Sequence, residues 1–312
     1  MNRRILHRIM IEESRYVGCF KGLAIGDAYG AHYEGGIAER LLWRLLGKTK
    51  DGRKRYTDDT QMSLDIATSF LANNSIDQDH LAQTFSNSYR WSRGYGPSAG
   101  RLLVGIRKGE KWQSLNRRKF KDGSMGNGAG MRAPLVALCY PKIDQDLEEN
   151  VRKSAEITHA HPLAIAGAQI IASATVMSLY GQCSKDIISS LIQVCDNPAY
   201  KTKLENCERL LVQKNSPSVK DIKLHLGNGM LALDSCVTAI YFGLKYTGLK
   251  FNVMLNEICR LGGDADTIAA MAGAIWGASN GSESIEVLAN NVENIEKIEA
   301  LARELYQKHL TS

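Results

Sequence analysis

The sequence contains few prolines and lacks the cysteine pairs that bind zinc. It has 6 prolines against 28 glycines in 312 residues. Because proline breaks helix interiors, this balance favours long helices joined by glycine-containing turns. The seven cysteines form no CxxC pair, and several, such as Cys139 and Cys236, lie within apolar runs. They are typical of buried thiols in a reducing compartment, so we expect a cytoplasmic protein.

A secretory signal and a clear membrane span are also missing. The N-terminal stretch MNRRILHRIM is basic but has no unbroken apolar core, unlike a signal peptide. Residues 160–184 carry no formal charge and are long enough to cross a bilayer. Polar residues such as His161, Gln169 and Gln182 interrupt this segment. It therefore predicts a buried core helix, and no membrane partner is expected.

An excess of charge of one sign is nearly absent. The formal net charge is +6, and much of it comes from the basic stretch 107–121. Such a run is typical of a solvated face, although a surface that meets an acidic target is the alternative interpretation. No specific nucleic-acid partner is predicted.

The apolar spacing indicates a series of helices and no convincing series of strands. No internal repeat or linker divides the chain, although residues 196–227 are polar and predict an insertion or a short helix between loops. We therefore predict one compact all-α domain over residues 1–312, with roughly a dozen or more helices, and a monomer. The clearest predicted helices lie near 15–31, 58–73, 78–92, 98–108, 128–140, 162–180, 229–246, 251–260, 265–278 and 294–310.

Two acidic clusters stand far apart in the sequence, each at the start of a predicted helix. In the first, Thr57 is a plausible N-cap and Asp58 and Asp59 follow it, an arrangement that helix capping alone explains. In the second, Asp264 and Asp266 follow two glycines that allow a sharp turn. Each cluster alone has an ordinary structural explanation.

Taken together, the clusters supply four carboxylates and two threonine hydroxyls, those of Thr57 and Thr267. An all-oxygen set of this kind suits a hard cation such as Mg²⁺. Neither cluster has a basic neighbour in the sequence, so cations would offset the repulsion if the fold brings them together. Two ions that share a carboxylate, about 3.5–4 Å apart, would account for the number of acids.

A glycine-rich helix face supplies a further acidic residue. Gly22, Gly26 and Gly30 recur every four residues, which allows a neighbouring helix to approach closely. Asp27 lies on this face and predicts a capping or hydrogen-bonding role in the interior. Glu34 follows the helix, either as an exposed loop acid or facing the metals.

Two glycine-rich turns precede predicted helices, at 94–98 and 126–132. Backbone N–H groups at such helix starts bind anions well. Neither turn matches the phosphate-binding loop or the dinucleotide-binding pattern. His159 is either a histidine satisfied within the core or a residue of the site.

These segments resemble the ADP-ribosylglycohydrolase family, which includes the dinitrogenase-reductase-activating glycohydrolases and the animal ADP-ribosylhydrolases. The similarity covers most of the chain. The matching segments are GLAIGDAYGAHYE (22–34), YTDDTQMSL (56–64), RGYGPSAGRLL (93–103), GNGAGMRAPLVAL (126–138), ITHAHPLAIAGA (157–168), LGNGMLALDSCVTAIYF (226–242) and LGGDADTIAAMAGAIWGA (261–278).

The resemblance implies an orthogonal helical bundle with a binuclear magnesium cleft, in which Mn²⁺ is a possible substitute. One ion would be held by Thr57, Asp58, Asp59 and Asp266, and the other by Asp264, Asp266 and Thr267. Glu34 would lie beside the second ion. The substrate groove would be lined by Tyr95, Gly96, Gly126, Asn127, Gly128, Met131 and His159.

The activity that the resemblance implies is hydrolysis of the bond between ADP-ribose and a modified substrate. Asp59 or Glu34 would orient or deprotonate the attacking water. The partner would be an ADP-ribosylated protein or another ADP-ribose conjugate, with arginine favoured over serine as the leaving group. A two-metal phosphoester hydrolase and an inert binding or structural relative are the alternatives.

Overall fold

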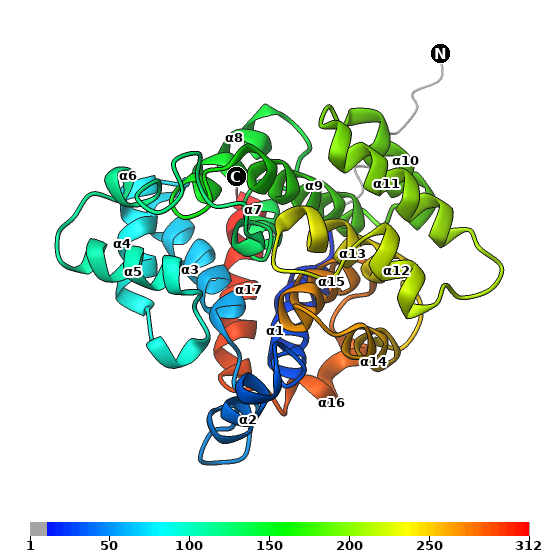
Figure 1. Ribbon diagram of the computed structural model, residues 1–312, viewed down its shortest axis with the longest axis horizontal. Helices are drawn as coiled ribbons and strands as arrows, with labels where there is room; N and C mark the ends of the chain where they lie inside the picture. Colours follow the sequence, from blue (N-terminus) through cyan, green and yellow to red (C-terminus); the bar gives the residue numbers. More distant parts are fainter. Residues whose placement is uncertain (1–10, 312) are drawn as a thin grey trace.

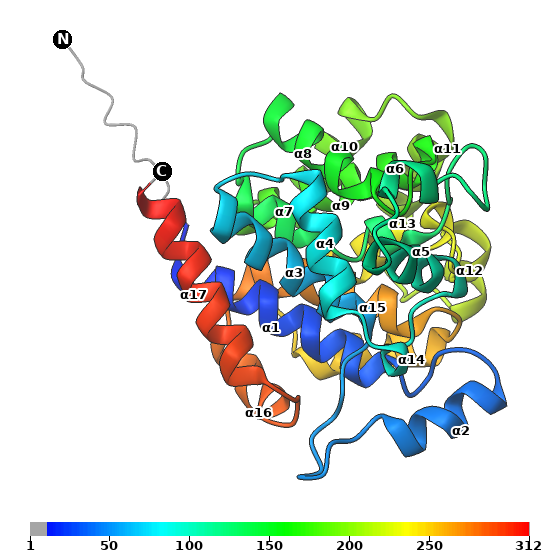
Figure 2. The same ribbon diagram turned by 90° about the vertical axis from the view of Figure 1, so that its left-hand side faces the viewer.

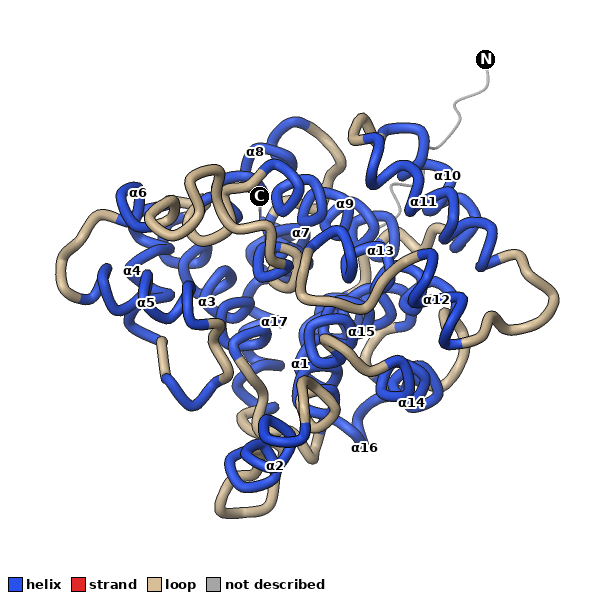
Figure 3. The backbone as a smooth tube through the Cα atoms, viewed as in Figure 1, coloured by secondary structure: helices blue, strands red, loops and turns tan. Residues whose placement is uncertain are grey.

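The computed structural model describes residues 11–311, and this range contains helices and no β-strand (Figure 1, Figure 3). The predicted all-α class is confirmed. The α-helices are α1 (Glu13–Gly30), α2 (Ile37–Leu46), α3 (Asp58–Asn73), α4 (Gln78–Ser88), α5 (Pro97–Arg107), α6 (Trp112–Leu115), α7 (Ala133–Cys139), α8 (Gln145–Glu156), α9 (Pro162–Leu179), α10 (Ser184–Val194), α11 (Pro198–Leu211), α12 (Val219–His225), α13 (Ala232–Lys245), α14 (Phe251–Leu261), α15 (Ala265–Asn280), α16 (Glu286–Ala289) and α17 (Ile295–Thr311). The 3₁₀ turns are Trp91–Arg93, Asn127–Ala129 and Glu283–Ile285.

Helices α1 and α15 lie side by side at the centre of the molecule (Figure 1, Figure 2). A Cβ atom on Gly22 would lie 2.1 Å from the carbonyl oxygen of Gly273, and one on Gly26 would lie 2.0 Å from that of Ala269. The two backbones therefore touch, as the glycine spacing predicts. The helices run antiparallel, so the end of α1 meets the start of α15, and a Cβ atom on Gly30 would lie 2.6 Å from Cα of Asp266.

The other helices surround this pair. Helices α9, α13 and α14 pack on α15, whereas α3, α16 and α17 contact α1. Helices α4 to α6 lie outside α3, and α10 to α12 lie outside α9 and α13 (Figure 1). Helix α2 projects from the body after the end of α1 (Figure 2).

Helix α9 is the segment that the sequence predicts as a buried core helix. It is long and apolar enough to cross a membrane, with a mean hydropathy of 1.6 over 18 residues, but 67% of that window is buried inside the protein. Pro162 lies in its first turn, where the missing N–H costs nothing, and the His161 side chain accepts a hydrogen bond from the Leu163 amide. The burial is that of a core helix.

The polar region 196–227 differs from the prediction of an insertion or one short helix, because it forms α11 and α12. The Asn197 side chain caps α11 by accepting hydrogen bonds from the Ala199 and Tyr200 amides. Ser218 and Asp221 form a reciprocal capping box at the start of α12. These capping signals were present in the sequence, but the high polarity of the segment hid them. Helix α8 also begins at a local cap, in which the Asp144 side chain accepts from the Leu147 amide.

Candidate metal and substrate site

The two acidic clusters and the loop after α1 meet in one cleft. Its acidic lining consists of Glu34, Asp58, Asp59, Asp264 and Asp266, and Thr267 lies beside them. Carboxylate oxygens of Glu34, Asp264 and Asp266 lie within 4.8 Å of one another. Glu34 therefore faces the acidic clusters instead of being an isolated loop acid.

A glycine turn sets the positions of Asp264 and Asp266. Gly262 and Gly263 have φ of 63° and 80°, a left-handed backbone that favours glycine. A Cβ atom on Gly263 would lie 2.0 Å from the carbonyl oxygen of Asn228, and the amide of Asp264 donates to that oxygen at 3.0 Å. The turn places Asp264 at the N-cap of α15 and Asp266 in its first helical turn.

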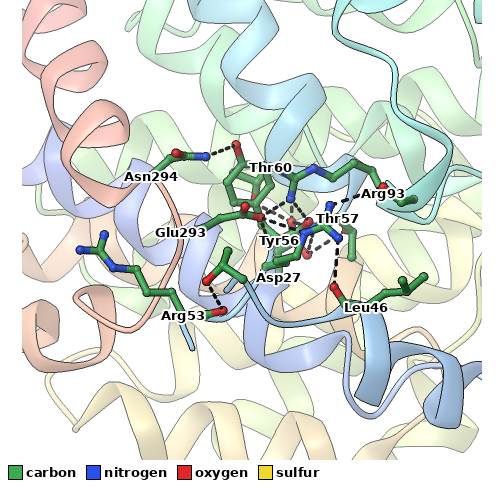
Figure 4. A network of polar contacts seen from close by, with 12 residues as sticks. Asp27, Leu46, Arg53, Tyr56, Thr57, Thr60, Arg93, Glu293 and Asn294 are labelled. Atoms are coloured by element: carbon green, nitrogen blue, oxygen red, sulfur yellow. Dashed lines mark hydrogen bonds and ion pairs between the residues drawn. The ribbon is translucent and has the colours of Figure 1, made fainter. Parts of the chain in front are cut away.

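Asp27 fixes the start of α3, where the other acidic cluster lies (Figure 4). Its buried carboxylate accepts hydrogen bonds from the backbone amides of Thr57 and Thr60, at 2.9–3.0 Å, and from both of their hydroxyls. Burial raises the pKa of Asp27, and these hydrogen bonds partly oppose that shift. The interior hydrogen-bonding role predicted for Asp27 is confirmed.

Asp59 retains an unpaired oxygen inside the cleft wall. The Thr57 hydroxyl lies 3.0 Å from Asp59 Oδ2 and accepts from the Asp59 amide. Asp59 Oδ1 is buried and has no hydrogen-bond partner among residues 11–311. A buried carboxylate oxygen without a donor is costly unless a cation binds it.

The acidic side chains of the cleft form no ion pair with a base among the described residues. Burial raises the pKa of Asp58, Asp59, Asp264 and Asp266, and neighbouring carboxylates raise it further. Within the described range, no lysine or arginine forms an ion pair with these four residues or with Glu34. An all-oxygen set with an orphaned carboxylate oxygen fits a hard divalent cation.

The glycine-rich turn at 126–132 and His159 form a wall of the cleft next to the acidic residues. Gly126, Gly128, Met131 and His159 line the cleft as predicted residues of the groove. A Cβ atom on Gly128 would lie 2.4 Å from Cε1 of the His159 ring, so the imidazole packs directly on the turn.

Asn127 also lines the cleft, but its amide already has protein partners. Nδ2 donates to Ser235 Oγ at 3.0 Å and to the Asp264 carboxylate. The Asn127 side chain therefore orients Asp264 in this structure. The sequence resemblance placed Asn127 in the substrate groove and did not predict this contact.

Some residues of the turn at 94–98 line the cleft and others do not. Gly96, Pro97 and Ser98 line the cleft, whereas Tyr95 is absent from that lining. The Tyr95 ring instead packs edge-on against Tyr89, with their centroids 4.8 Å apart. Tyr95 is half-buried and lines a neighbouring pocket with Tyr89 and Pro97, and its assignment to the substrate groove stays a prediction.

An ion pair that the sequence did not indicate holds this part of the chain in place (Figure 4). Buried Arg93 pairs with Glu293, donates to the Tyr56 carbonyl oxygen at 2.6 Å, and lies 4.0 Å above the Tyr56 ring centre. Glu293 also accepts from the Tyr56 amide at 3.1 Å. The pair ties the residue before Gly94 to the segment that enters α3.

The cleft also contains residues for which the sequence suggested no site role. Lys119 and Phe120 line it, and they belong to the basic stretch 107–121. In the sequence, only the alternative interpretation of that stretch, as a surface that faces an acidic target, pointed to a site role for Lys119 and Phe120. Ser124 and Met230 also line the cleft.

Comparisons with known proteins agree with the sequence resemblance. The family model of ADP-ribosylglycohydrolase matches residues 10–312. The chain is 32% identical to ADP-ribosylhydrolase ARH3 of Danio rerio, over 94% of this chain and 90% of that protein. It is 28% identical to the ADP-ribosyl-[dinitrogen reductase] glycohydrolase of Rhodospirillum rubrum, over 87% of each. A solved structure described as an ADP-ribosylglycohydrolase-related protein complex has the same fold, with a TM-score of 0.69 and 24% identity over 95% of this chain and 98% of that one.

Proposed function

Because the chain belongs to the ADP-ribosylglycohydrolase family, we propose that it hydrolyses the glycosidic bond between ADP-ribose and a modified substrate, with two Mg²⁺ ions. The observation that carries this proposal is the cleft itself. Five carboxylates converge there without an ion pair to any base among residues 11–311, and two glycine-rich turns form the adjoining wall.

The proposed ligands follow the two acidic clusters. One ion is assigned to Thr57, Asp58, Asp59 and Asp266, and the other to Asp264, Asp266 and Thr267, with Glu34 beside it. The proximity of Glu34 to Asp264 and Asp266 supports the second assignment. Bound Mg²⁺ would offset the repulsion among the carboxylates and polarise the ribose hydroxyls.

The protein's own carboxylates would act on the water. Cleavage adds water to C1″ of the ribose and returns a proton to the leaving group, through an oxocarbenium-like transition state. Asp59 lines the cleft beside the other carboxylates, so we assign it to orient or deprotonate the water, with Glu34 as the second candidate. The negative cleft also favours the positive charge that develops on the sugar.

The diphosphate would meet the other side of the cleft. Helix α5 begins at Pro97, which has no N–H, so the backbone N–H groups of Ser98 and Ala99 are the ones available to an anion, and the Ser98 side chain adds a hydroxyl. Lys119 contributes a positive charge to the same cleft. These features suit a ligand with one anionic part and one part that binds divalent cations.

The first test is release of ADP-ribose from an arginine-ADP-ribosylated protein, with Mg²⁺ and with EDTA, beside a serine-linked substrate. We expect Mg²⁺-dependent release. Arginine is the expected leaving group because the GYGP turn at 94–97 resembles the nitrogenase-regulating branch. Release from serine alone would move the proposal to that linkage, and Mn²⁺ in place of Mg²⁺ would test the choice of ion.

Product analysis separates the alternatives. A product cut within the diphosphate would identify a two-metal phosphoester hydrolase. Binding of ADP-ribose without release from either linkage would identify a binding protein.

A further inference from the structure

Arg132 is a buried cation behind the cleft wall, and it has no carboxylate partner among the described residues. Its side chain is fully buried, and its guanidinium lies 5.1 Å from the Phe85 ring centre. It donates to the Gly128 carbonyl oxygen, to Ser154 Oγ at 3.2 Å and Ser154 O at 2.8 Å, and to Thr158 Oγ1 at 2.9 Å. Arginine has no acceptor atom, so every one of these contacts has a fixed direction.

The Thr158 hydroxyl links Arg132 to His159 through two hydrogen bonds, and the direction of the first fixes that of the second. Thr158 Oγ1 lies 2.7 Å from His159 Nδ1 while it accepts from Arg132. A hydroxyl has one hydrogen to donate. If Thr158 donates to Nδ1, all three groups are satisfied. If Nδ1–H donated to Thr158 instead, the buried hydroxyl hydrogen would have no acceptor within residues 11–311.

The other ring nitrogen of His159 is open to the cleft. His159 lines the cleft, and a Cβ atom on Gly126 would lie 3.1 Å from its Nε2 atom. Nε2 has no hydrogen-bond partner in the part of the chain that the structure describes, and the atom is not completely buried. A proton on Nε2 would therefore be available to a ligand.

We propose that Arg132 and Thr158 are positioning residues that hold His159 in its neutral Nε2–H tautomer, so that it offers the bound ligand a hydrogen-bond donor. The ligand atom at this position is then an acceptor, such as an oxygen or an unprotonated ring nitrogen. The identity of that ligand rests on the proposed function, whereas the tautomer does not.

The electrostatic surroundings agree with this geometry. Burial, and then the charge of Arg132, lower the pKa of His159 to about 3. Burial lowers the pKa of Arg132 itself only to about 9, so Arg132 stays charged at neutral pH. Both shifts favour a neutral His159 ring, as the hydrogen-bond directions require.

The test is the ¹⁵N spectrum of the full-length protein labelled at histidine. The chain has 7 histidines, and His159→Gln identifies the His159 signal. We expect Nε2 to carry the proton and Nδ1 to show the shift of an unprotonated nitrogen between pH 6 and 8. Thr158→Val removes the donor to Nδ1, so the Nδ1 signal should move to that of an unprotonated nitrogen without a hydrogen bond, and Thr158→Ser should restore the original spectrum.

Thr175→Val is the matched control, because Thr175 is buried and its hydroxyl bonds to the Ile171 carbonyl within α9. In the presence of Mg²⁺, we expect Thr158→Val to weaken ADP-ribose binding about fivefold, the effect of one lost hydrogen bond. Thr158→Ser and Thr175→Val should leave it unchanged.

An Nδ1–H tautomer in the wild-type protein would overturn the inference, and that spectrum decides even if Thr158→Val does not fold. An unchanged Nδ1 signal in folded Thr158→Val would also overturn the role of Thr158. If ADP-ribose does not bind but the Nε2–H signal is present, the proposed function fails and the tautomer assignment stands.

Discussion

Asp59 and Asp65 lie six residues apart on α3 and have different surroundings. Asp59 lines the cleft and leaves Oδ1 without a donor. Asp65 is buried away from the cleft, where its carboxylate accepts from the Ser88 hydroxyl and the Gln61 amide group. Burial raises the pKa of Asp65 to about 7 although both donors oppose the shift. The two residues therefore form a matched pair of buried acids, of which only one faces the proposed substrate.

Replacing Asp59 by Asn should lower kcat about 100-fold or more, because a group that activates the attacking water is lost. Asp65→Asn should leave the rate of ADP-ribose release close to that of the wild type. Both variants are assayed at saturating Mg²⁺, and circular dichroism confirms that they fold. Full turnover by Asp59→Asn would refute its assignment and direct the same test to Glu34.

The acidic cleft should also make the free energy of unfolding depend on pH, and Mg²⁺ should weaken that dependence. Asp58, Asp59, Asp264 and Asp266 have native pKa values above the unfolded value near 4, so the native state binds more protons than the unfolded state between those values. The metal-free protein should therefore gain stability as the pH falls from about 8 to 6.5. Below that range, protonation of unfolded-state histidines opposes the gain.

Thermal melting in EDTA and in Mg²⁺ measures this effect. The stabilisation by Mg²⁺ should be largest at pH 8 and shrink towards pH 6.5, because protons and cations compete for the same oxygens. Asp65 contributes equally in both buffers, so the difference between the two curves isolates the cleft. Parallel curves would show that no cation binds these carboxylates.

At the scale of elements, the contact between α1 and α15 positions the acidic residues of the cleft. The two helices touch through backbone atoms at steps of four residues, from Gly18 and Gly277 at one end to Gly30 and Asp266 at the other. Interiors are packed so closely that an added methyl group forces the helices apart. The separation of these helices therefore also sets how near the Glu34 loop comes to Asp266.

Gly22→Ala should lower the free energy of unfolding by about 2–3 kcal/mol, because its Cβ atom would overlap the Gly273 carbonyl at the middle of this contact. Gly229→Ala is the matched control, since its Cβ atom would lie 3.7 Å from the nearest atom, an ordinary contact. Urea denaturation of both variants gives the comparison. A neutral Gly22→Ala would mean that the helices are not held at this spacing.

The elements that the sequence predicted well are those with local signals. The spacing of Gly22, Gly26 and Gly30 predicts the close helix contact, and the Gly262–Gly263 turn marks the start of α15. The polar helices α11 and α12 were harder to predict, because only their capping residues distinguish them from loops. The contacts of Arg93 with Glu293, and of Asn127 with Asp264, join residues far apart in the chain. Such pairs depend on the complete fold and have no local pattern.

At the scale of the whole molecule, contacts between the two ends of the chain are frequent. The Tyr306 hydroxyl donates to the Ile11 carbonyl at 3.1 Å, and Arg303 pairs with Glu13. Buried Lys21 bridges Glu286 and Glu299 at 2.6–2.7 Å. Because α1 packs between late helices, the early and late parts of the chain share one core (Figure 2).

One cooperative unfolding transition is therefore expected, in agreement with the prediction of a single domain. The chain has 4 tryptophans, distributed from Trp43 to Trp276, so fluorescence reports on distant regions and far-ultraviolet circular dichroism reports on all helices. The two signals should change at the same denaturant concentration. Separate midpoints would divide the chain into independently folding parts.

The antiparallel pairing of α1 with α15 also has a consequence for the order in which the protein is synthesised. Helix α1 emerges from the ribosome long before α15, and its glycine face lacks that partner until residues 265–280 emerge. Until then, Asp58 and Asp59 have no Asp264 or Asp266 beside them. A nascent chain that stops before residue 264 therefore has only half of the acidic cleft, and the four aspartates can come together only after Asp264 and Asp266 have been synthesised.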